Sequence, residues 1–256
     1  MSPRAVRILR EVRLIAAEDT RHTGKLLKHF EIPTPLTSYF EHNKLQKLEH
    51  VLHALQAGDV ALVSDAGTPA LNDPGFELVG AALAAGHAVI PVPGPSAAIA
   101  ALVVSGLATD SFLYLGYLPH KAGDRRKRLE EVAHEPHTLI FLESPHRIAE
   151  ALDDILAALG DRRIAVAREM TKMFEEYWRG SVSEAALHFA SQPARGEFVI
   201  VLAGRMDQHD QKWSEAQLTG AIRQGAEAGE SPSQLAARLA QQSGWKRREV
   251  YKRITS

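Results

Sequence analysis

The chain has 256 residues, of which 45% are hydrophobic and 24% are charged, enough for one large unit or two compact units with a full core. Its formal net charge is −1, so bulk charge does not indicate a nucleic-acid partner, which has to be sought in local patches. The absence of cysteine excludes disulfides, thiolate metal sites and a cysteine nucleophile and suits a reducing cytoplasm, and no apolar run is long enough to span a bilayer.

The predicted elements alternate between helices and strands. The chain opens with a basic stretch that predicts an amphipathic helix, with Val6, Leu9 and Val12 on one side. Short apolar runs then predict strands at residues 13–17, 60–64, 88–92, 111–116, 138–143, 164–168 and 198–203. Helical patterns lie between several of these runs, which predicts the α/β class with βαβ units and mainly parallel sheets.

Two polar breaks divide the chain. They fall near residues 106–111 and 204–213, and they predict α/β domains at 1–108 and 109–204 and a helical extension at 212–256. Within the extension, Ser231 and Pro232 are typical of a helix start, and Ser243–Gly244 separates that helix from a final one. This spacing is typical of a helix-turn-helix.

Several familiar motifs are absent. The sequence has no G-x-G-x-x-G, no P-loop, no H-E-x-x-H and no cluster of metal-ligand residues, so no metal site is predicted. The stretch Pro93–Ala97 follows a predicted strand and opens a helix, but it lacks the glycine spacings of a nucleophile elbow and a partner histidine. Serine hydrolysis is therefore not predicted.

The first unusual loop reads SDAGTPALNDPG and follows the predicted strand at 60–64. Ligands of open α/β sheets bind at the carboxyl ends of strands, where Gly67 and Gly75 allow close backbone approach and Asp65 supplies an acceptor. Asp73–Pro74 is expected to cap the next helix. The alternative is a tight, well-capped connection, but such connections need only about 2–6 residues.

A second loop, PVPGPSA, follows the predicted strand at 88–92. Ser96 is placed to cap the next helix, whose free N–H groups would favour a carboxylate or phosphate. Capping alone explains this loop equally well.

Three further strand ends carry polar residues. The first holds Glu18, Asp19, Arg21 and His22, and capping of the following helix by Asp19 or Thr20 is the simpler interpretation. LESPHR (142–147) and AREMTK (167–172) repeat the pattern of acid, hydroxyl and base. If these ends converge, they form a cleft between two sheets.

Two basic patches stand out from the near-neutral chain. Residues 120–128 carry a net charge of +4, and the tail from Arg205 holds nine Lys or Arg against six Asp or Glu. Such patches neutralise phosphates and make binding sensitive to salt. The alternative is a solvated basic helix.

The motifs taken together resemble a known family. EDTRHTGKLLKHF, ALVSDAGTPALNDPG, VPVPGPSAAIAAL, GYLP, TLIFLESPHR, VAREMTK and RGEFVIVL occur in this order. Over nearly all of residues 4–203 the chain resembles the tetrapyrrole (corrin/porphyrin) methylase superfamily, and within it the branch that methylates small-subunit ribosomal RNA. The resemblance implies two α/β domains with S-adenosylmethionine in the cleft between them, a cytoplasmic homodimer, and 2′-O-methylation of a cytidine ribose in 16S ribosomal RNA, free or in the assembled small subunit.

The resemblance also implies site residues. The residues expected to contact the cofactor are Asp65, Ala66, Gly67, Thr68, Pro69, Gly94, Pro95, Ser96, Leu142, Glu143, Ser144, Ala167, Arg168, Glu169, Gly196 and Glu197. The candidate general bases are Glu18, Asp19 and Glu169. The candidate RNA-binding residues are Arg21, His22, Lys121, Arg125, Arg126, Lys127, Arg128, Lys172, Lys246, Arg247 and Arg248.

One departure from the family keeps alternatives open. Family members begin with a strand and a P-x-P-x-G-N-L loop ahead of the helix that opens here at Arg4, so a longer natural chain is expected. The loop helps to hold the cofactor, and without it a non-catalytic RNA-binding protein is one alternative. The other alternative is C-methylation of a corrin or porphyrin precursor, against which the basic patches and helical tail argue.

Overall fold

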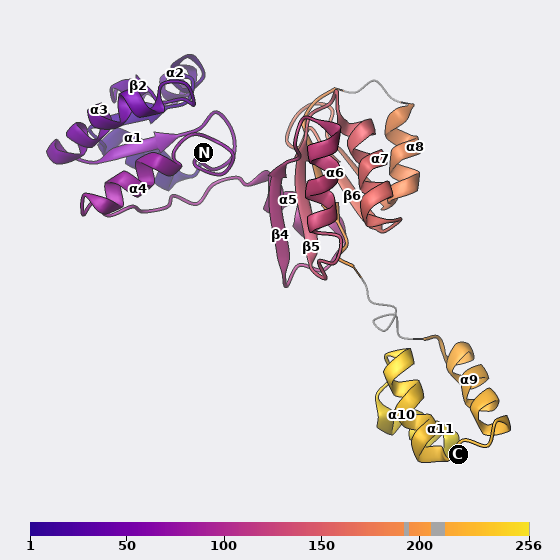
Figure 1. Cartoon of the computed structure of the whole chain (residues 1–256). Coiled ribbons are helices and arrows are strands. Elements are labelled where there is room, and N and C mark those ends of the chain that lie inside the picture. Colours follow the sequence, from indigo (N-terminus) through magenta and orange to yellow (C-terminus); the bar gives the residue numbers. More distant parts are fainter. Residues whose placement is uncertain (192–194, 206–212, 256) are drawn as a thin grey trace. The chain divides into compact units, whose positions relative to one another are not determined.

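The structure, a computed structural model, describes residues 1–191, 195–205 and 213–255. The chain divides into two compact units, Met1–Val104 and Ser105–Ser256 (Figure 1). Each unit contains one β-sheet, with three strands in the first unit and five in the second. The domain boundaries at 108 and 204 stay a prediction.

The first unit is built around a parallel sheet. Its elements are α1 (Pro3–Glu11), β1 (Leu14–Ala17), α2 (Thr20–His29), β2 (Leu36–Ser38), α3 (Lys44–Ala57), β3 (Val60–Val63), α4 (Phe76–Ala84) and α5 (Ala97–Ser105), which ends at the boundary. β1 lies between β2 and β3, and both pairs are parallel. The carboxyl ends of β1 and β3 therefore lie at the same edge of this sheet.

The amphipathic helix predicted at the start of the chain is confirmed. Ser2 caps α1 by accepting a hydrogen bond from the backbone of Ala5, and Pro3 occupies the first turn. Leu9 and Val12 are buried in a cluster with Ile15 of β1. The apolar side of α1 thus contributes to the core of the first unit.

The second unit is built around a mixed sheet. Its elements before the tail are β4 (Phe112–Tyr117), α6 (Ala122–Glu131), β5 (Thr138–Glu143), α7 (Ile148–Leu159), β6 (Arg163–Arg168), β7 (Glu176–Ser181), α8 (Val182–Ala190) and β8 (Phe198–Leu202). The strand order is β4-β5-β8-β6-β7, and only β4 and β5 are parallel. The prediction of mainly parallel sheets is wrong here, because β8 enters between β5 and β6 in the opposite direction.

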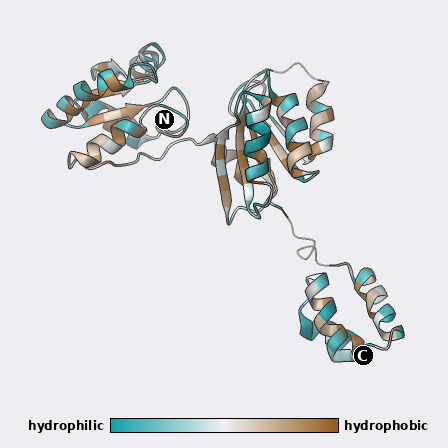
Figure 2. Cartoon of the chain, in the orientation of Figure 1, coloured by the Kyte–Doolittle hydropathy of each residue, from teal (hydrophilic) through white to brown (hydrophobic). Residues whose placement is uncertain are grey.

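The core of the second unit lies between its sheet and three helices. α6, α7 and α8 lie side by side along one face of the sheet in Figure 1, and their apolar residues pack against β5, β6 and β8. Phe141, Ile155 and Phe198 are almost fully buried there. Figure 2 shows apolar residues concentrated on the strands, while the helices alternate between apolar and polar sides.

The sequence prediction differs from the structure at three strands. Residues 88–92 form no strand, because Pro91 and Pro93 lack the N–H groups that a ladder needs, and Ile90 is 67% exposed. The short strand β2 and the edge strand β7 were not predicted. The other predicted strands are confirmed to within two residues at each end.

The tail forms three helices with a core of their own. They are α9 (Glu215–Glu227), α10 (Pro232–Ser243) and α11 (Arg247–Thr255). Ser231 caps α10, and Gly244 adopts the left-handed conformation that ends it, as the sequence predicted. The predicted fold class, α/β with a C-terminal helical segment, is therefore confirmed.

The polar connection predicted at 204–213 lies mostly outside the described residues. Among the residues that are described, the structure has no helix both long and apolar enough to cross a membrane.

Candidate functional site

The carboxyl ends of β1 and β3 bring predicted site residues together. The backbone N–H of Asp65 donates to Glu18 Oε2 at 3.1 Å, and the N–H of Asp19 donates to Asp65 Oδ1 at 3.3 Å. His22 Nδ1 lies 3.5 Å from the other oxygen of Asp65. The two segments are more than forty residues apart in sequence, but parallel pairing places their strand ends at one edge.

The two glycine- and proline-rich loops of the first unit also meet. Thr68 Oγ1 donates to the carbonyl of Pro95 at 3.0 Å. Gly67 has a φ of +72°, and a Cβ added there would contact nothing within 4 Å. A Cβ on Gly94 would come no closer than 3.9 Å to its nearest neighbour, the Val92 carbonyl. The backbone of both loops is therefore open to a ligand.

Asp73 has a different environment from the one predicted. Gly75, not Asp73, precedes α4, and that helix has no side-chain cap. Burial, and next the negative charge of Glu18, raise the pKa of Asp73, while a hydrogen bond with Ser64 opposes the rise. The prediction of a helix cap is wrong, and sequence reasoning missed Asp73 as a candidate site residue. The signal was available, since Asp73 belongs to the same loop as Asp65.

Asp19 acts as a helix cap, which was the simpler of its two interpretations. Its Oδ1 accepts the backbone N–H of Arg21 at 2.8 Å, and its Oδ2 accepts the guanidinium of Arg21 at 2.6 Å. The Arg21 guanidinium and N–H hold the pKa of Asp19 well below its usual range. Asp19 is therefore a weak proton acceptor at neutral pH.

The second sheet gathers its predicted residues at one edge. Glu143 at the end of β5 pairs with Phe198 at the start of β8, and Phe198 pairs with Arg168 at the end of β6. This register places the segments 142–144, 167–169 and 196–197 beside one another. Two of the polar strand ends, 142–147 and 167–172, therefore lie together within this sheet, and the cleft between two sheets stays a prediction.

Glu169 and Glu197 share one lysine at this edge. Lys172 Nζ lies 2.8 Å from Glu169 Oε1 and 3.1 Å from Glu197 Oε2. The backbone N–H of Glu197 also donates to Glu169 at 3.0 Å, and hydrogen bonds from Lys172 and then from this N–H lower the pKa of Glu169. Gly196 permits this packing, since a Cβ there would come within 2.2 Å of Glu169 Cγ.

Arg147 joins the segments that follow β4 and β5. Its Nη2 donates to the carbonyls of Leu118 at 2.6 Å and Pro119 at 3.0 Å, and to Glu143 Oε2 at 3.1 Å. Burial raises the pKa of Glu143, opposed by the N–H of Ser144 and by the charge of Arg147. Arg147 lies within the LESPHR stretch, but the sequence alone predicted no role for it.

Arg125 has to be removed from the RNA-binding candidates. Its side chain is only 2% exposed, and its Nε lies 2.6 Å from Asp154 Oδ2. Arg126 Nε lies 2.6 Å from the other oxygen of Asp154. Although burial opposes it, hydrogen bonds from both arginines lower the pKa of Asp154. Part of the +4 patch therefore neutralises a buried carboxylate of α7.

The other RNA-binding candidates of the two patches lie at the surface. The exposed candidates are Lys121, Arg126, Lys127, Arg128, Lys246, Arg247 and Arg248. Arg128 forms an ion pair with Glu131 at 2.9 Å. These positions are compatible with contacts to a polyanion.

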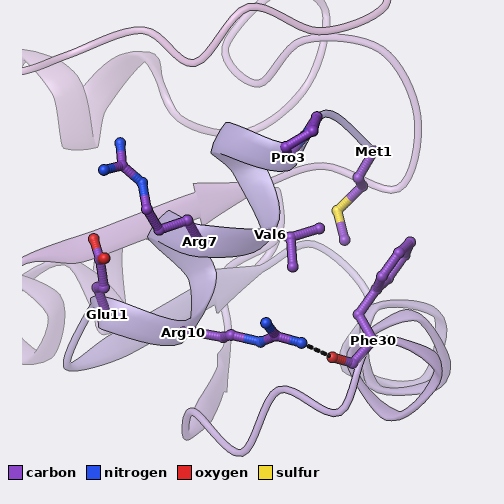
Figure 3. A pocket seen from close by; sticks show the side chains of 7 residues that line it. All are labelled: Met1, Pro3, Val6, Arg7, Arg10, Glu11 and Phe30. Atoms are coloured by element: carbon purple, nitrogen blue, oxygen red, sulfur yellow. Dashed lines mark hydrogen bonds between the residues drawn. The ribbon is translucent and has the colours of Figure 1, made fainter.

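A surface cavity of about 510 Å³ lies in the first unit. It is lined by Met1, Pro3, Val6, Arg7, Arg10, Glu11 and Phe30 (Figure 3). Among these lining residues, the Arg10 guanidinium donates to the Phe30 carbonyl at 2.7 Å (Figure 3). None of the predicted site residues lines this cavity.

Comparison with known proteins first defines the class. The family model described as Tetrapyrrole (Corrin/Porphyrin) Methylases matches residues 1–186. Among solved structures, a uroporphyrin III C-methyl transferase from Thermus thermophilus aligns with a TM-score of 0.56 at 20% identity, over 79% of this chain and 90% of that one. A cobalt precorrin-4 methyltransferase aligns with a TM-score of 0.59 at 14% identity, over 79% and 88%. Family model and fold together define a methylase of this class.

Curated relatives narrow the class. The ribosomal RNA small subunit methyltransferase I of Synechocystis sp. is 46% identical over 98% of this chain and 91% of its own length. The protein of the same name from Xylella fastidiosa is 48% identical over 98% and 92%. The chain belongs to the ribosomal RNA small subunit methyltransferase I family, which confirms the resemblance found in its motifs, and it is a methyltransferase.

Proposed function

We propose that the chain transfers a methyl group from S-adenosylmethionine to the ribose 2′-oxygen of a cytidine in small-subunit ribosomal RNA. The observation that carries this proposal is the identity of 46% and 48% to relatives of that name over 98% of the chain. The two sheet edges support it, because each gathers backbone and carboxylate groups suited to a small polar ligand.

The residues present fit S-adenosylmethionine. The cofactor carries a positive sulfur, an ammonium, ribose hydroxyls and an adenine amino group, which all favour carboxylate and carbonyl partners. Asp65 offers such a carboxylate, and the open backbone at Gly67 and Gly94 allows close approach. When bound, S-adenosylmethionine supplies a methyl group on a positively charged sulfur that needs no further activation.

One of the protein's own side chains would then accept the proton of the ribose 2′-hydroxyl. A base has to come within about 2.6–3.2 Å of that hydroxyl. Asp19 and Glu169 are poor bases, because Arg21 and Lys172 lower their pKa values. Asp73 is the better acceptor, since burial raises its pKa, and Glu18 beside it is the second candidate.

Basic side chains near these residues would hold the RNA. Arg21 and His22 lie at the first edge, and Lys172 lies at the second, although Arg21 and Lys172 are also bound to carboxylates. A phosphate would compete with those carboxylates for the same donors. We further infer a cytoplasmic homodimer that acts on ribosomal RNA, free or in the small subunit.

The experiment is nucleoside analysis after reaction. Small ribosomal subunits are incubated with the protein and S-adenosylmethionine, and the ribosomal RNA is digested and measured by mass spectrometry. The proposal expects 2′-O-methylcytidine to increase. A base-methylated nucleoside, or no new methylated nucleoside, would overturn it. Calorimetry with S-adenosylmethionine tests the binding-only alternative, which requires that no heat of binding be detected.

A further inference from the structure

The three-helix tail is a separately packed element. Leu218 of α9, Leu235 and Leu239 of α10 and Val250 of α11 are at most 1% exposed. The Trp245 indole N–H donates to a backbone carbonyl at 2.7 Å, which fixes the start of α11 on the bundle. The orientation of α11 on the bundle therefore rests on a shared core.

One side of α11 faces this core, and the opposite side is exposed. Val250 and Ile254 contact the core cluster. Arg248, Tyr251, Lys252 and Thr255 follow helical spacing on the exposed side, and Tyr251 is 46% exposed. Together with Lys246 they form what we term the α11 face.

The charges of the tail are distributed unevenly. Arg223, Arg238 and Arg253 each bind a glutamate of the tail, at 2.9, 2.6 and 2.9 Å. Among the described residues, no carboxylate lies within ion-pair distance of Lys246 or Arg248. Two cations without a carboxylate partner among the described residues, Lys246 and Arg248, therefore belong to the α11 face.

We propose that the α11 face binds the sugar-phosphate backbone of double-helical RNA. The choice of RNA as the partner rests on the proposed function. Two unpaired cations with an exposed tyrosine and threonine match an array of phosphates and ribose hydroxyls. A membrane is a poorer partner, because the face has no large aliphatic side chain. Single-stranded RNA is also a poorer partner, because it is bound by successive aromatic platforms and this face has one aromatic residue.

The binding would have little sequence preference. The major groove of A-form RNA is too deep and narrow for side chains to read, so a helix contacts the phosphates along its edges. The α11 face would therefore act as an anchor on rRNA helices, separate from the residues that select the cytidine.

The test uses the full chain and a fluorescent RNA duplex of arbitrary sequence, with dissociation constants measured by anisotropy at several salt concentrations. Arg248→Gln is expected to lower the slope of log affinity against log salt by about one, and Lys246→Gln with Arg248→Gln by about two. Arg223→Gln is the matched control, since it removes the same charge from the same bundle but from a paired arginine. Its slope is expected to stay at the wild-type value.

The outcomes separate this inference from the proposed function. Wild-type slopes in both α11 variants, with a wild-type protein that methylates small subunits, would overturn the inference alone. A wild-type protein that methylates no RNA but binds the duplex through Arg248 would overturn the proposed function alone. Arg248→Lys keeps the charge and should restore the wild-type slope. Circular dichroism of each variant shows whether the bundle is still folded. Arg248→Glu reverses the charge and should bind the duplex more weakly than Arg248→Gln, which provides a second measure of the charge effect.

Discussion

A single guanidinium, that of Arg147, satisfies two carbonyls and one buried carboxylate at an edge of the second sheet. Arginine suits this position because its planar fork presents several donors in fixed directions, whereas lysine presents a compact point charge. The side chain of Glu143 is fully buried, so the arginine also supplies the compensating charge. The loops that bear Leu118 and Ser144 are held together by this residue.

Replacing Arg147 by glutamine is expected to destabilise the protein at neutral pH. It would leave the Glu143 carboxylate buried and unpaired, which typically costs about 3–5 kcal/mol. Without Arg147 the pKa of Glu143 rises further above its unfolded value. A carboxyl with a raised folded pKa contributes stability that is present at low pH and is lost as pH rises through that pKa. The loss should therefore be larger at pH 8 than at pH 5, as measured by urea unfolding followed by circular dichroism.

A double variant provides the control. Glu143→Gln combined with Arg147→Gln removes the unpaired charge, so much of the stability lost in the single variant should return and its pH dependence should disappear. Equal losses in the single and the double variant would show that the ion pair is not the cause.

Asp73 is the first candidate for the proton acceptor at the edge of the first sheet, because burial raises its pKa. Asp73→Asn is expected to lower kcat for methyl transfer by about 10²–10⁴-fold, because an amide cannot accept the 2′-hydroxyl proton. The affinity for S-adenosylmethionine measured by calorimetry should change little. Asp59→Asn, at the opposite end of β3, is the matched control and should retain wild-type kcat.

A kcat for Asp73→Asn within twofold of wild type would exclude Asp73 as the base. The same assay on Glu18→Gln would then decide whether Glu18 has that role.

At the scale of the element, the sequence predicts strands well where apolar runs are long and buried. The run at 138–143 forms β5 with the predicted bounds, and this strand is buried on both faces between β4 and β8. The apolar run at 88–92 was predicted as a strand but forms none, because Pro91 and Pro93 lack the N–H donors that strand pairing needs. The edge strand β7 was missed, since its charged residues and its glycine are not typical of a buried strand.

The candidate site was predictable in part. Its Asp65 loop and the Glu169 edge carry unusual glycine, proline and acidic residues, which the sequence shows directly. Arg125 was misassigned because a cation in a basic run looks exposed until the fold places Asp154 beside it. Arg147 was missed because its partners Leu118 and Pro119 are distant in sequence, whereas Asp73 could have been considered from its place in the Asp65 loop.

Substitution of Gly196 tests whether the edge of the second sheet takes part in binding S-adenosylmethionine. Gly196→Ala adds a Cβ within 2.2 Å of Glu169 Cγ at a residue with a φ of +90°. The Glu169 side chain would have to move away from Lys172, and we expect binding of S-adenosylmethionine to weaken by about tenfold or more, or about 1.4 kcal/mol. Calorimetry provides the measurement.

The matched control for this variant is Gly123→Ala. Gly123 lies in α6, where an added Cβ meets nothing within 4 Å, so stability should be unchanged or raised by up to about 1 kcal/mol. Wild-type affinity in Gly196→Ala would argue against a cofactor role for the Gly196–Glu197 turn.

In the whole molecule, the two α/β units and the helical tail have different proposed roles. Each sheet presents its polar residues at one edge, and the tail carries a separate cationic face on α11. The fold is shared with enzymes named for porphyrin and corrin methylation, at 14–20% identity. The acceptor therefore has to be decided by reaction and not by fold.

The most direct test supplies tritium-labelled S-adenosylmethionine to the protein with two acceptors in parallel, purified small ribosomal subunits and uroporphyrinogen. Label is expected to enter the ribosomal RNA and not the uroporphyrinogen. Label in uroporphyrinogen alone, or in neither acceptor, would contradict this expectation.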